Sequence, residues 1–506
     1  MKNRIQYASI WLLLVSHIAT VAAQDLEWDV GLSANRTVIH ARGIRASSQP
    51  APTVLYLAGL NGETVESERV RSIFSAYSQL KEQDRPVNLI TIPLANPDAE
   101  GLRFPPDGNA YAENTTSNVI WRWLGVHAPD VIILADEESG LASALQSESV
   151  AAFGAIPVQR LSATTSTIEY LRGMSTLEPS AARIELERRL NRSPEQLARQ
   201  LAEIYGHDFS SPAYVPGMGL IGRMRLGEIE DIETLLQPYL TEGAIDVSNA
   251  SILAGQLVFA EHAERTGNAR SLQLAINAAD LAFDAAGNML EAMPMHSEMS
   301  DSLFMATPLL VKVGKLTGNP KYFDMAARHV EFMRALLLRD DGLYRHSPLA
   351  DVAWGRGNAF PALGLALSLS DFPETHPAFP ALKQAYLQQM ETLRPFVDAE
   401  GMWHEVIDYP GSFAELSATA MIGIAIKRGI DRGWLSSVIY QPILDRTWNA
   451  VLTRTSMDGV FIDVCTSTGK LQSLDAYLDR LAIFDLDDRA GGMVMNFANE
   501  MASTIK

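Results

Sequence analysis

The second half of the chain alternates between two kinds of hydrophobic pattern. Several segments are apolar nearly all the way round a helix, and they begin near Val215, Asn358, Ala414 and Gly492. Amphipathic segments separate them, and these span residues 269–285, 320–338, 380–396 and 437–453. Helices that are apolar all round belong in the interior, and amphipathic helices cover them. The pattern predicts an all-α domain with inner and outer helices over residues 208–506.

An internal repeat supports this arrangement of helix pairs. Thr266-Gly267-Asn268 recurs 51 residues later as Thr317-Gly318-Asn319, and SILAGQLVFAEHAERTGN aligns with SLFMATPLLVKVGKLTGN. A repeated helix pair with one buried partner is typical of stacked helical architectures. Six such pairs can close on themselves as an (α/α)6 barrel. The connections from outer to inner helices then meet at one end, where we expect a pocket.

The first half of the chain has a different period. Apolar, β-branched runs at residues 53–57, 87–92 and 131–134 end in turn residues, and a fourth strand is expected to begin near 151–154. Helical patterns at 66–82 and 116–124 lie between them, which predicts an α/β domain with a mostly parallel sheet over residues 24–164. Residues 165–207 are charged and helical, with a helix start at Ser193, and are interpreted as a connector.

Composition and charge restrict the compartment and the partners. Residues 1–23 have a basic start, an apolar run and a small-residue end at Val21-Ala22-Ala23, which predicts a cleaved signal peptide and an exported, periplasmic or secreted protein. The formal charge of −19 argues against nucleic acid and membrane surfaces as partners. Cys465 is the only cysteine, so no intramolecular disulfide can form, and we expect a buried thiol. The oligomeric state is left open.

Three loops of the first domain carry a resemblance to a known family. They read AGLNGETVES, IPLANPDAEG and PDVIILADE, and they resemble the metal-binding loops of the zinc carboxypeptidases. Asn61, Thr64 and Asp136 stand where that family has its ligands. A catalytic zinc ion needs three well-placed protein ligands. The resemblance therefore implies a carboxypeptidase-like fold that has lost its metal, with a structural or carbohydrate-contacting role.

Six motifs in the second half also follow the order of a known family. They are DSLFMA from Asp301, GLYRH to His346, WGRGN from Trp354, WHEV from Trp403, ELSATAM from Glu415 and CTSTG from Cys465. Together they resemble the unsaturated rhamnogalacturonyl hydrolases of glycoside hydrolase family 105, with family 88 more distant. The resemblance implies an (α/α)6 barrel that needs no metal or cofactor. It also implies removal of a Δ4,5-unsaturated uronic acid from the non-reducing end of oligosaccharides produced by lyases.

The resemblance gives roles to four residues. Asp301 matches the catalytic acid, which must hold a proton near neutral pH and give it to the double bond. Trp354 and Arg356 match the substrate pocket, where a guanidinium suits a uronate carboxylate and an indole suits a sugar ring. His346 matches a residue that contacts the substrate or the attacking water. Considered by itself, Asp301 would instead be interpreted as a helix N-cap.

Further candidates rest on weaker grounds. His404 and His296 are placed at the substrate pocket by their position near the motifs. Ser412 and Glu415 fit a capping box, so Glu415 has a structural interpretation as well. The family commonly has a second carboxylate on the preceding inner helix, where this chain has Ser251, and Asp246 is the nearest acid.

Two alternatives to the hydrolase remain at this point. The first is a non-catalytic carbohydrate-binding barrel. The second is a sugar epimerase on the same barrel, which would need two catalytic histidines on inner helices.

Overall fold

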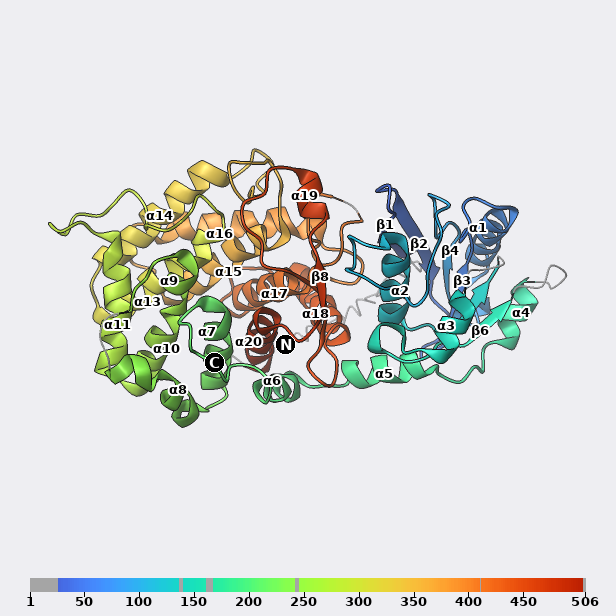
Figure 1. Cartoon of the computed structure of the whole chain (residues 1–506), viewed down its shortest axis with the longest axis horizontal. Coiled ribbons are helices and arrows are strands. Elements are labelled where there is room, and N and C mark those ends of the chain that lie inside the picture. The colour runs from blue at the N-terminus through green and yellow to red at the C-terminus, as the bar shows by residue number, and fades with distance from the viewer. Residues whose placement is uncertain (1–25, 136–139, 161–166, 242–244, 410, 504–506) are drawn as a thin grey trace, which may run out of the picture.

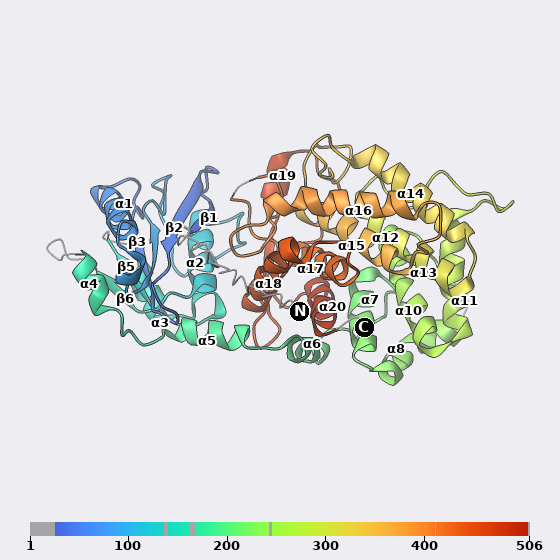
Figure 2. The same ribbon diagram turned by 180° about the vertical axis from the view of Figure 1, so that it is seen from behind.

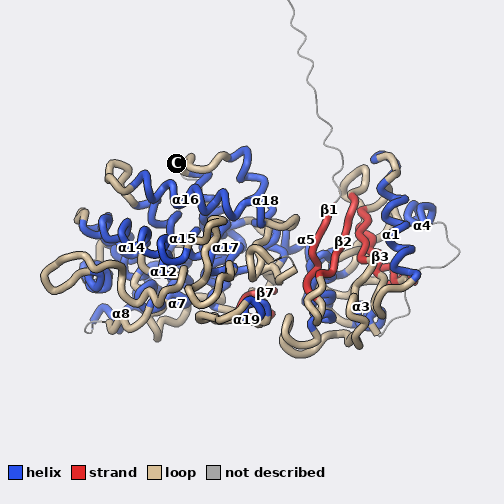
Figure 3. Tube along the Cα trace, turned by 90° about the horizontal axis from the view of Figure 1, so that it is seen from above, coloured by secondary structure: helices blue, strands red, loops and turns tan. Residues whose placement is uncertain are grey.

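The computed structural model describes residues 26–135, 140–160, 167–241, 245–409 and 411–503. It has two parts, an α/β domain and a helical barrel, which lie side by side (Figures 1 and 2). All strands of the larger sheet lie in the first part, and the second part is almost entirely helical (Figure 3). The predicted signal peptide and Asp136 lie outside the described residues. No helix among those described is long and apolar enough to cross a membrane.

The first domain is built on a six-stranded sheet in the order β1-β2-β4-β3-β5-β6. Its strands are β1 (Leu26–Leu32), β2 (Val38–Ile44), β3 (Thr53–Leu57), β4 (Asn88–Ile92), β5 (Val131–Leu134) and β6 (Val158–Arg160). The four strands β4, β3, β5 and β6 run parallel, and β1 and β2 extend the sheet in antiparallel fashion. The mostly parallel sheet is therefore confirmed. The fourth predicted strand was misplaced, because Ala151 and Ala152 adopt left-handed backbone conformations that a strand cannot contain.

Helices cover both faces of this sheet. On one face α1 (Val65–Ser78) and α4 (Thr167–Gly173) pack over Val54 and Tyr56. On the other, α2 (Thr115–His127) and α3 (Leu141–Ser147) pack over Leu55 and Leu57. Successive residues of a strand point to opposite faces, which is why a continuous apolar run such as β3 serves two cores.

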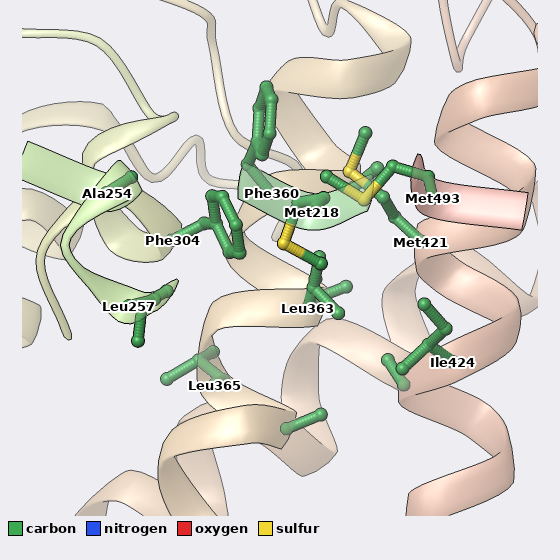
Figure 4. Close-up of a cluster of buried hydrophobic side chains, with 14 of the residues drawn as sticks. Met218, Ala254, Leu257, Phe304, Phe360, Leu363, Leu365, Met421, Ile424 and Met493 are labelled. Atoms are coloured by element: carbon green, nitrogen blue, oxygen red, sulfur yellow. The ribbon is translucent and has the colours of Figure 1, made fainter. Parts of the chain in front are cut away.

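The second part is a closed ring of six inner helices. The ring consists in order of α7 (Tyr214–Arg225), α9–α10 (Ala250–Gly255 and Leu257–Thr266), α12–α13 (Ser302–Met305 and Thr307–Thr317), α15 (Gly355–Asp371), α17 (Leu416–Asp431) and α20 (Asp488–Ala502). Each packs against the next, and α20 returns to α7. Side chains from all six, including Met218, Phe304, Phe360 and Met421, fill the centre (Figure 4). The barrel interior is a packed core.

Outer helices cover this ring. They are α8 (Ile229–Thr241), α11 (Ala269–Ala279), α14 (Lys321–Leu337), α16 (Phe379–Leu393), α18 (Ser437–Thr453) and α6 (Pro194–Ala202). The last of these corrects the predicted connector, because α6 packs against α20 and buries Leu197 and Leu201 in the barrel core. Ser193 caps this helix as predicted. The remaining connector helix, α5 (Ala181–Leu190), packs against α18.

The internal repeat corresponds to two consecutive inner helices. α10 ends at Thr266 and α13 ends at Thr317, and the glycines that follow them, Gly267 and Gly318, adopt the left-handed conformation of a C-terminal cap. Each inner helix is also interrupted near its start, after Gly255 in one repeat and after Met305 in the next. A short helical turn therefore leads each of these inner helices, and Asp301 stands at the start of one of them.

A ring of alternating charges closes the barrel at the C-terminal ends of the inner helices. We call it the ionic ring, and its members in order are Arg225, Glu261, Lys312, Asp371, Arg428 and Glu500. Ion pairs join Arg225 to Glu261 (3.7 Å), Glu261 to Lys312 (4.0 Å), Lys312 to Asp371 (2.6 Å), Arg428 to Glu500 (2.5 Å) and Glu500 to Arg225 (3.0 Å). Arg428 also donates to the Ser370 hydroxyl on α15 (3.0 Å).

Candidate active site

Hydrogen bonds from the backbone and from the Asn358 side chain bring three of the predicted motifs together at the N-terminal ends of the inner helices. The Ser300 amide donates to the His346 carbonyl (3.0 Å), which ties the start of α12 to the turn that holds His346. Asn358 on α15 exchanges hydrogen bonds with both the amide and the carbonyl of Tyr344 (2.8 and 2.9 Å). These bonds fix Asp301 and His346 relative to α15.

Close packing of α15 on α12 sets the depth of this site. At Gly364 a Cβ atom would lie 2.3 Å from the Leu303 carbonyl oxygen. Only glycine allows two helices to approach so closely. Gly364 therefore fixes the distance between α15 and the short helix that follows Asp301.

Asp301 faces His346 rather than capping its helix. It directly precedes α12, yet its side chain makes no capping hydrogen bond to the described backbone. Its Oδ1 atom lies 3.4 Å from His346 Nε2. Both of these atoms are buried, and neither has a hydrogen-bond partner among the described residues. The interpretation of Asp301 as a simple N-cap is therefore wrong, and its carboxylate is directed at the histidine.

His346 is held in place on two sides. Its Nδ1 atom lies 2.8 Å from the Tyr477 hydroxyl, and its ring packs against Trp354 with ring centroids 4.4 Å apart. Burial raises the pKa of Tyr477 to about 12, so the hydroxyl keeps its proton and can donate to Nδ1. His346 Nε2 then carries the proton that faces Asp301. Tyr477 was not predicted, and it lies outside every motif.

Trp354 leads to a second carboxyl group. Its Nε1–H donates to Glu405 Oε1 (2.9 Å), and the Cys465 thiol donates to the same oxygen (3.1 Å). Burial and the neighbouring Glu415 raise the pKa of Glu405 to about 8, so Glu405 is protonated at neutral pH. The prediction that Cys465 is buried is confirmed. Glu405 belongs to the WHEV motif but was not predicted as a site residue. The signal that could have identified it is an acid that lies between apolar residues.

Arg356 organises the wall of the site. Its two Nη groups donate to the Cys465 and Thr466 carbonyls (2.7 Å each), and its guanidinium lies 3.7 Å from Glu415. The side chain is completely buried. Its Nε–H is buried and has no hydrogen-bond partner among the described residues. A two-pronged contact between Arg356 and a substrate carboxylate would require at least one of the Nη bonds to be exchanged.

Glu415 is placed differently from the capping box considered for it. Glu415 is itself the N-cap of α17 and accepts from the Ser417, Ala418 and Cys465 amides. The capping box that begins at Ser412 is therefore wrong. α15 begins at Gly355, three residues before the start that was expected near Asn358.

Among the described residues, the remaining candidates make no hydrogen bond or ion pair with Asp301 or His346. His404 pairs with Asp398 (3.1 Å) and lines a cavity of about 840 Å³ between the barrel and the first domain. His296 is half-buried in the loop before Asp301, and its ring packs against Phe332. Asp246 is exposed in the segment before α9, and Ser251 lies at the start of that helix. The structure therefore does not bring these residues into contact with the Asp301–His346 pair.

Two of the three residues at the predicted lost metal site of the first domain, Asn61 and Thr64, lie among the described residues. Thr64 is the N-cap of α1, and its hydroxyl accepts from the Ser67 amide (3.2 Å). Asn61 lies three residues before it, in the loop after β3. Within the part of the chain that the structure describes, no group of three or more histidine, cysteine, aspartate or glutamate side chains could hold a metal ion.

The fold and the site together define a six-hairpin barrel with a carboxyl–histidine pair at the mouth formed by its inner helices. The profile described as Glycosyl Hydrolase Family 88 matches residues 235–505, which include the whole of this site. The chain belongs to Glycosyl Hydrolase Family 88.

Curated relatives match part of the barrel. The unsaturated rhamnogalacturonyl hydrolase YesR of Bacillus subtilis (strain 168) is 26% identical over 214 residues, which are 41% of this chain and 57% of that protein. An unsaturated 3S-rhamnoglycuronyl hydrolase of Alteromonas sp. (strain LOR) is 26% identical over 172 residues, 32% of this chain and 42% of the relative. The chain thus spans about half the length of the curated relatives it matches.

Solved structures show the same fold for the barrel. A possible member of the GH105 family from Salmonella enterica superposes with a TM-score of 0.52 at 21% identity, covering 61% of this chain and 93% of that one. A possible GH105 member from Klebsiella pneumoniae gives 0.53 at 21% identity, covering 61% and 92%. The predicted (α/α)6 barrel is confirmed.

Proposed function

We propose that this protein is a glycoside hydrolase that removes a Δ4,5-unsaturated uronic acid from the non-reducing end of oligosaccharides produced by polysaccharide lyases. Membership of the family supports this proposal, as do the two curated relatives, which are an unsaturated rhamnogalacturonyl hydrolase and an unsaturated 3S-rhamnoglycuronyl hydrolase.

The observation that carries the proposal is the Asp301–His346 pair. Two buried polar atoms, Asp301 Oδ1 and His346 Nε2, lie 3.4 Å apart and have no other hydrogen-bond partner among the described residues. Native proteins satisfy nearly all buried polar atoms, and the exceptions concentrate at functional sites. A substrate or a water molecule held between the two groups would satisfy both.

The reaction is the one that the family resemblance implies, and the Asp301–His346 pair offers the groups for its proton transfers. Asp301 in its acid form gives its proton to C4 of the double bond, and water adds at C5 while its own proton passes to the Asp301 carboxylate. The product is a hemiketal, which opens and releases the sugar behind it. His346 orients the water, and Tyr477 fixes the tautomer that His346 needs. Each proton taken from Asp301 is returned, so the enzyme is regenerated.

The test uses the loss of ultraviolet absorbance when the conjugated double bond of a lyase product is hydrated. We expect wild type to consume the substrate and Asp301→Asn to lose activity on the order of 10³-fold, since an amide cannot supply the proton. Glu298→Gln changes an exposed acid in the same loop and should retain wild-type turnover. Equal slow consumption by wild type and Asp301→Asn would contradict the proposal. Binding without consumption would favour a carbohydrate-binding barrel, and an epimeric product would favour an epimerase.

We also propose that the first domain is a carboxypeptidase-like fold without its metal, and that the protein is exported. The loops quoted above and the apolar N-terminal segment support these two proposals. Stoichiometric zinc in the purified protein would contradict the first. A mature protein that retains residues 1–23 after expression in a bacterial host would contradict the second.

A further inference from the structure

We propose that the first domain is a positioning part of the active site and acts through the segment 461–485 of the barrel. This inference rests on the proposed function for its catalytic consequence. The segment contains β7 (Phe461–Cys465), α19 (Leu474–Leu478) and β8 (Ala482–Asp485). β8 and α19 lie on the side of the barrel that faces the first domain (Figure 1).

The first contact is a buried ion pair between the two domains. Arg122 on α2 donates to Asp463 on β7, and the Tyr111 hydroxyl donates to the same carboxylate oxygen (3.0 Å). Arg122 also donates to the Ala482 carbonyl on β8 (3.4 Å). Arg122 and Asp463 are both less than a tenth exposed. One side chain of the first domain therefore reaches both strands of this hairpin.

Asp463 needs this partner for a second reason. It adopts a left-handed backbone conformation (φ 64°) at a bulge, where the register between β7 and β8 shifts. Such a conformation is costly for a residue other than glycine and persists only where surrounding contacts hold it. Arg122 and Tyr111 supply those contacts, so they also fix the course of β7 beyond the bulge.

The segment beyond the bulge forms the wall of the active site. Two residues after Asp463, the Cys465 carbonyl accepts a hydrogen bond from Arg356, and the Cys465 thiol donates to Glu405. Further along the same segment, Tyr477 contacts His346 Nδ1. A shift of β7 would therefore move the groups that hold His346 in register with Asp301.

Apolar contacts reinforce the ion pair. Leu32 at the end of β1 belongs to one buried cluster with Trp354, Phe413 and Tyr477. Tyr111 stacks on Phe413 with ring centroids 4.8 Å apart and an interplanar angle of 12°. The same side of the first domain thus shares one buried cluster with the tryptophan and the tyrosine that enclose His346.

A third set of contacts is weaker. Arg36, in the turn between β1 and β2, pairs with Asp475 (3.6 Å) and Asp479 (2.9 Å) around α19. Both acids are largely exposed, and exposed ion pairs contribute little. The positioning effect is therefore assigned to the buried contacts of Arg122, Tyr111 and Leu32.

The experiment compares Arg122→Met and Asp463→Asn with a matched control. Asparagine tolerates the left-handed conformation, so Asp463→Asn removes the charge without forcing the bulge to change. Arg36→Met is the control, because Arg36 also reaches the segment 461–485 across the domain interface, but only through exposed ion pairs with Asp475 and Asp479 (3.6 and 2.9 Å). We expect the first two variants to lower kcat on the order of 10-fold to 100-fold, with KM nearly unchanged, since small misplacements of catalytic groups have effects of this size. The control should keep wild-type kcat.

Cys465 gives a readout that needs no activity. As the only thiol of the chain, it is buried, and it should react slowly with a thiol reagent in the native protein. Arg122→Met should accelerate this reaction at least tenfold, and Arg36→Met should not. If wild type proves inactive but these labelling rates hold, the proposed function fails and the positioning of β7 stands. Unchanged labelling in Arg122→Met overturns the positioning role.

A double mutant tests the route through Tyr477. If the first domain acts by placing the Tyr477 hydroxyl, Tyr477→Phe and Arg122→Met should shift the pH profile of kcat in the same direction, because both release His346 Nδ1. The double mutant should then fall little below Tyr477→Phe alone. Fully additive losses in kcat with separate pH profiles would overturn this route.

Discussion

Replacing Glu261 by glutamine should weaken the barrel in a manner that depends on pH. Burial by itself would raise the pKa of Glu261, but Arg225, Lys312 and Arg265 together lower it from 4.5 to about 2. A carboxylate whose pKa is lower in the folded state stabilises the fold above its unfolded pKa, and this stability is lost as the pH falls through the folded pKa. The contribution is thus full at neutral pH and disappears below about pH 2.

The magnitude follows from the two pKa values. With 1.36 kcal/mol for each unit, the charge of Glu261 contributes about 3 kcal/mol at pH 7 and about 1.4 kcal/mol at pH 3. Glu261→Gln should therefore lower the free energy of unfolding about twice as much at pH 7 as at pH 3.

Urea unfolding at the two pH values, followed by far-ultraviolet circular dichroism, measures the difference. Glu264→Gln is the control, because Glu264 pairs with Lys312 and Lys315 near the same ring but is more exposed. It should change the free energy of unfolding by less than about 1 kcal/mol at either pH. A loss in Glu261→Gln that is equal at pH 7 and pH 3 would show that packing, and not charge, is responsible, and would refute the reasoning.

Two further predictions concern the site. Glu405 is protonated in the folded protein and ionised in the unfolded one between pH 4.5 and about 8, so its carboxyl costs stability across that range. Glu405→Gln should raise the free energy of unfolding at pH 7 by on the order of 2–3 kcal/mol and leave it unchanged at pH 4. Urea titration at the two pH values measures this difference, and the same change at both would contradict the prediction. Gly364→Ala should force α15 away from the Leu303 carbonyl, which should lower the stability of the fold by about 1–3 kcal/mol and also lower turnover. Thermal unfolding measures the loss of stability, and a variant as stable as wild type would disprove the close approach.

The fold could be predicted largely because its hydrophobic pattern is local. The amphipathic segment 437–453 has the bounds of α18, and the apolar run 53–57 is β3. The helix α6 is easily mistaken for part of a connector because it is only nine residues long and follows a strongly charged helix. Its apolar side, with Leu197 and Leu201, becomes meaningful only when α20 is known to lie against it.

The site could be predicted only in part, because motifs show which residues matter and not what they contact. Asp301 and His346 were found from the sequence, and the structure brings them together. Tyr477 contacts His346 across 131 positions and belongs to no motif, so nothing local revealed it. The acceptors of Arg356 are backbone carbonyls, which every residue has, and a sequence cannot single them out.

The ionic ring has a consequence for the number of helices in the barrel. Charges that alternate around a closed ring need an even number of members, so five or seven inner helices would bring two like charges together. At about 4 Å such a contact costs about 4 kcal/mol where the effective dielectric constant is near 20. The change of sign is part of the repeat itself, because Glu261 and Lys312 occupy equivalent positions 51 residues apart. Gain or loss of a single repeat would therefore place two like charges side by side in the ionic ring, at the end of the barrel opposite the Asp301–His346 pair. Gain or loss of two repeats would keep the alternation of charges.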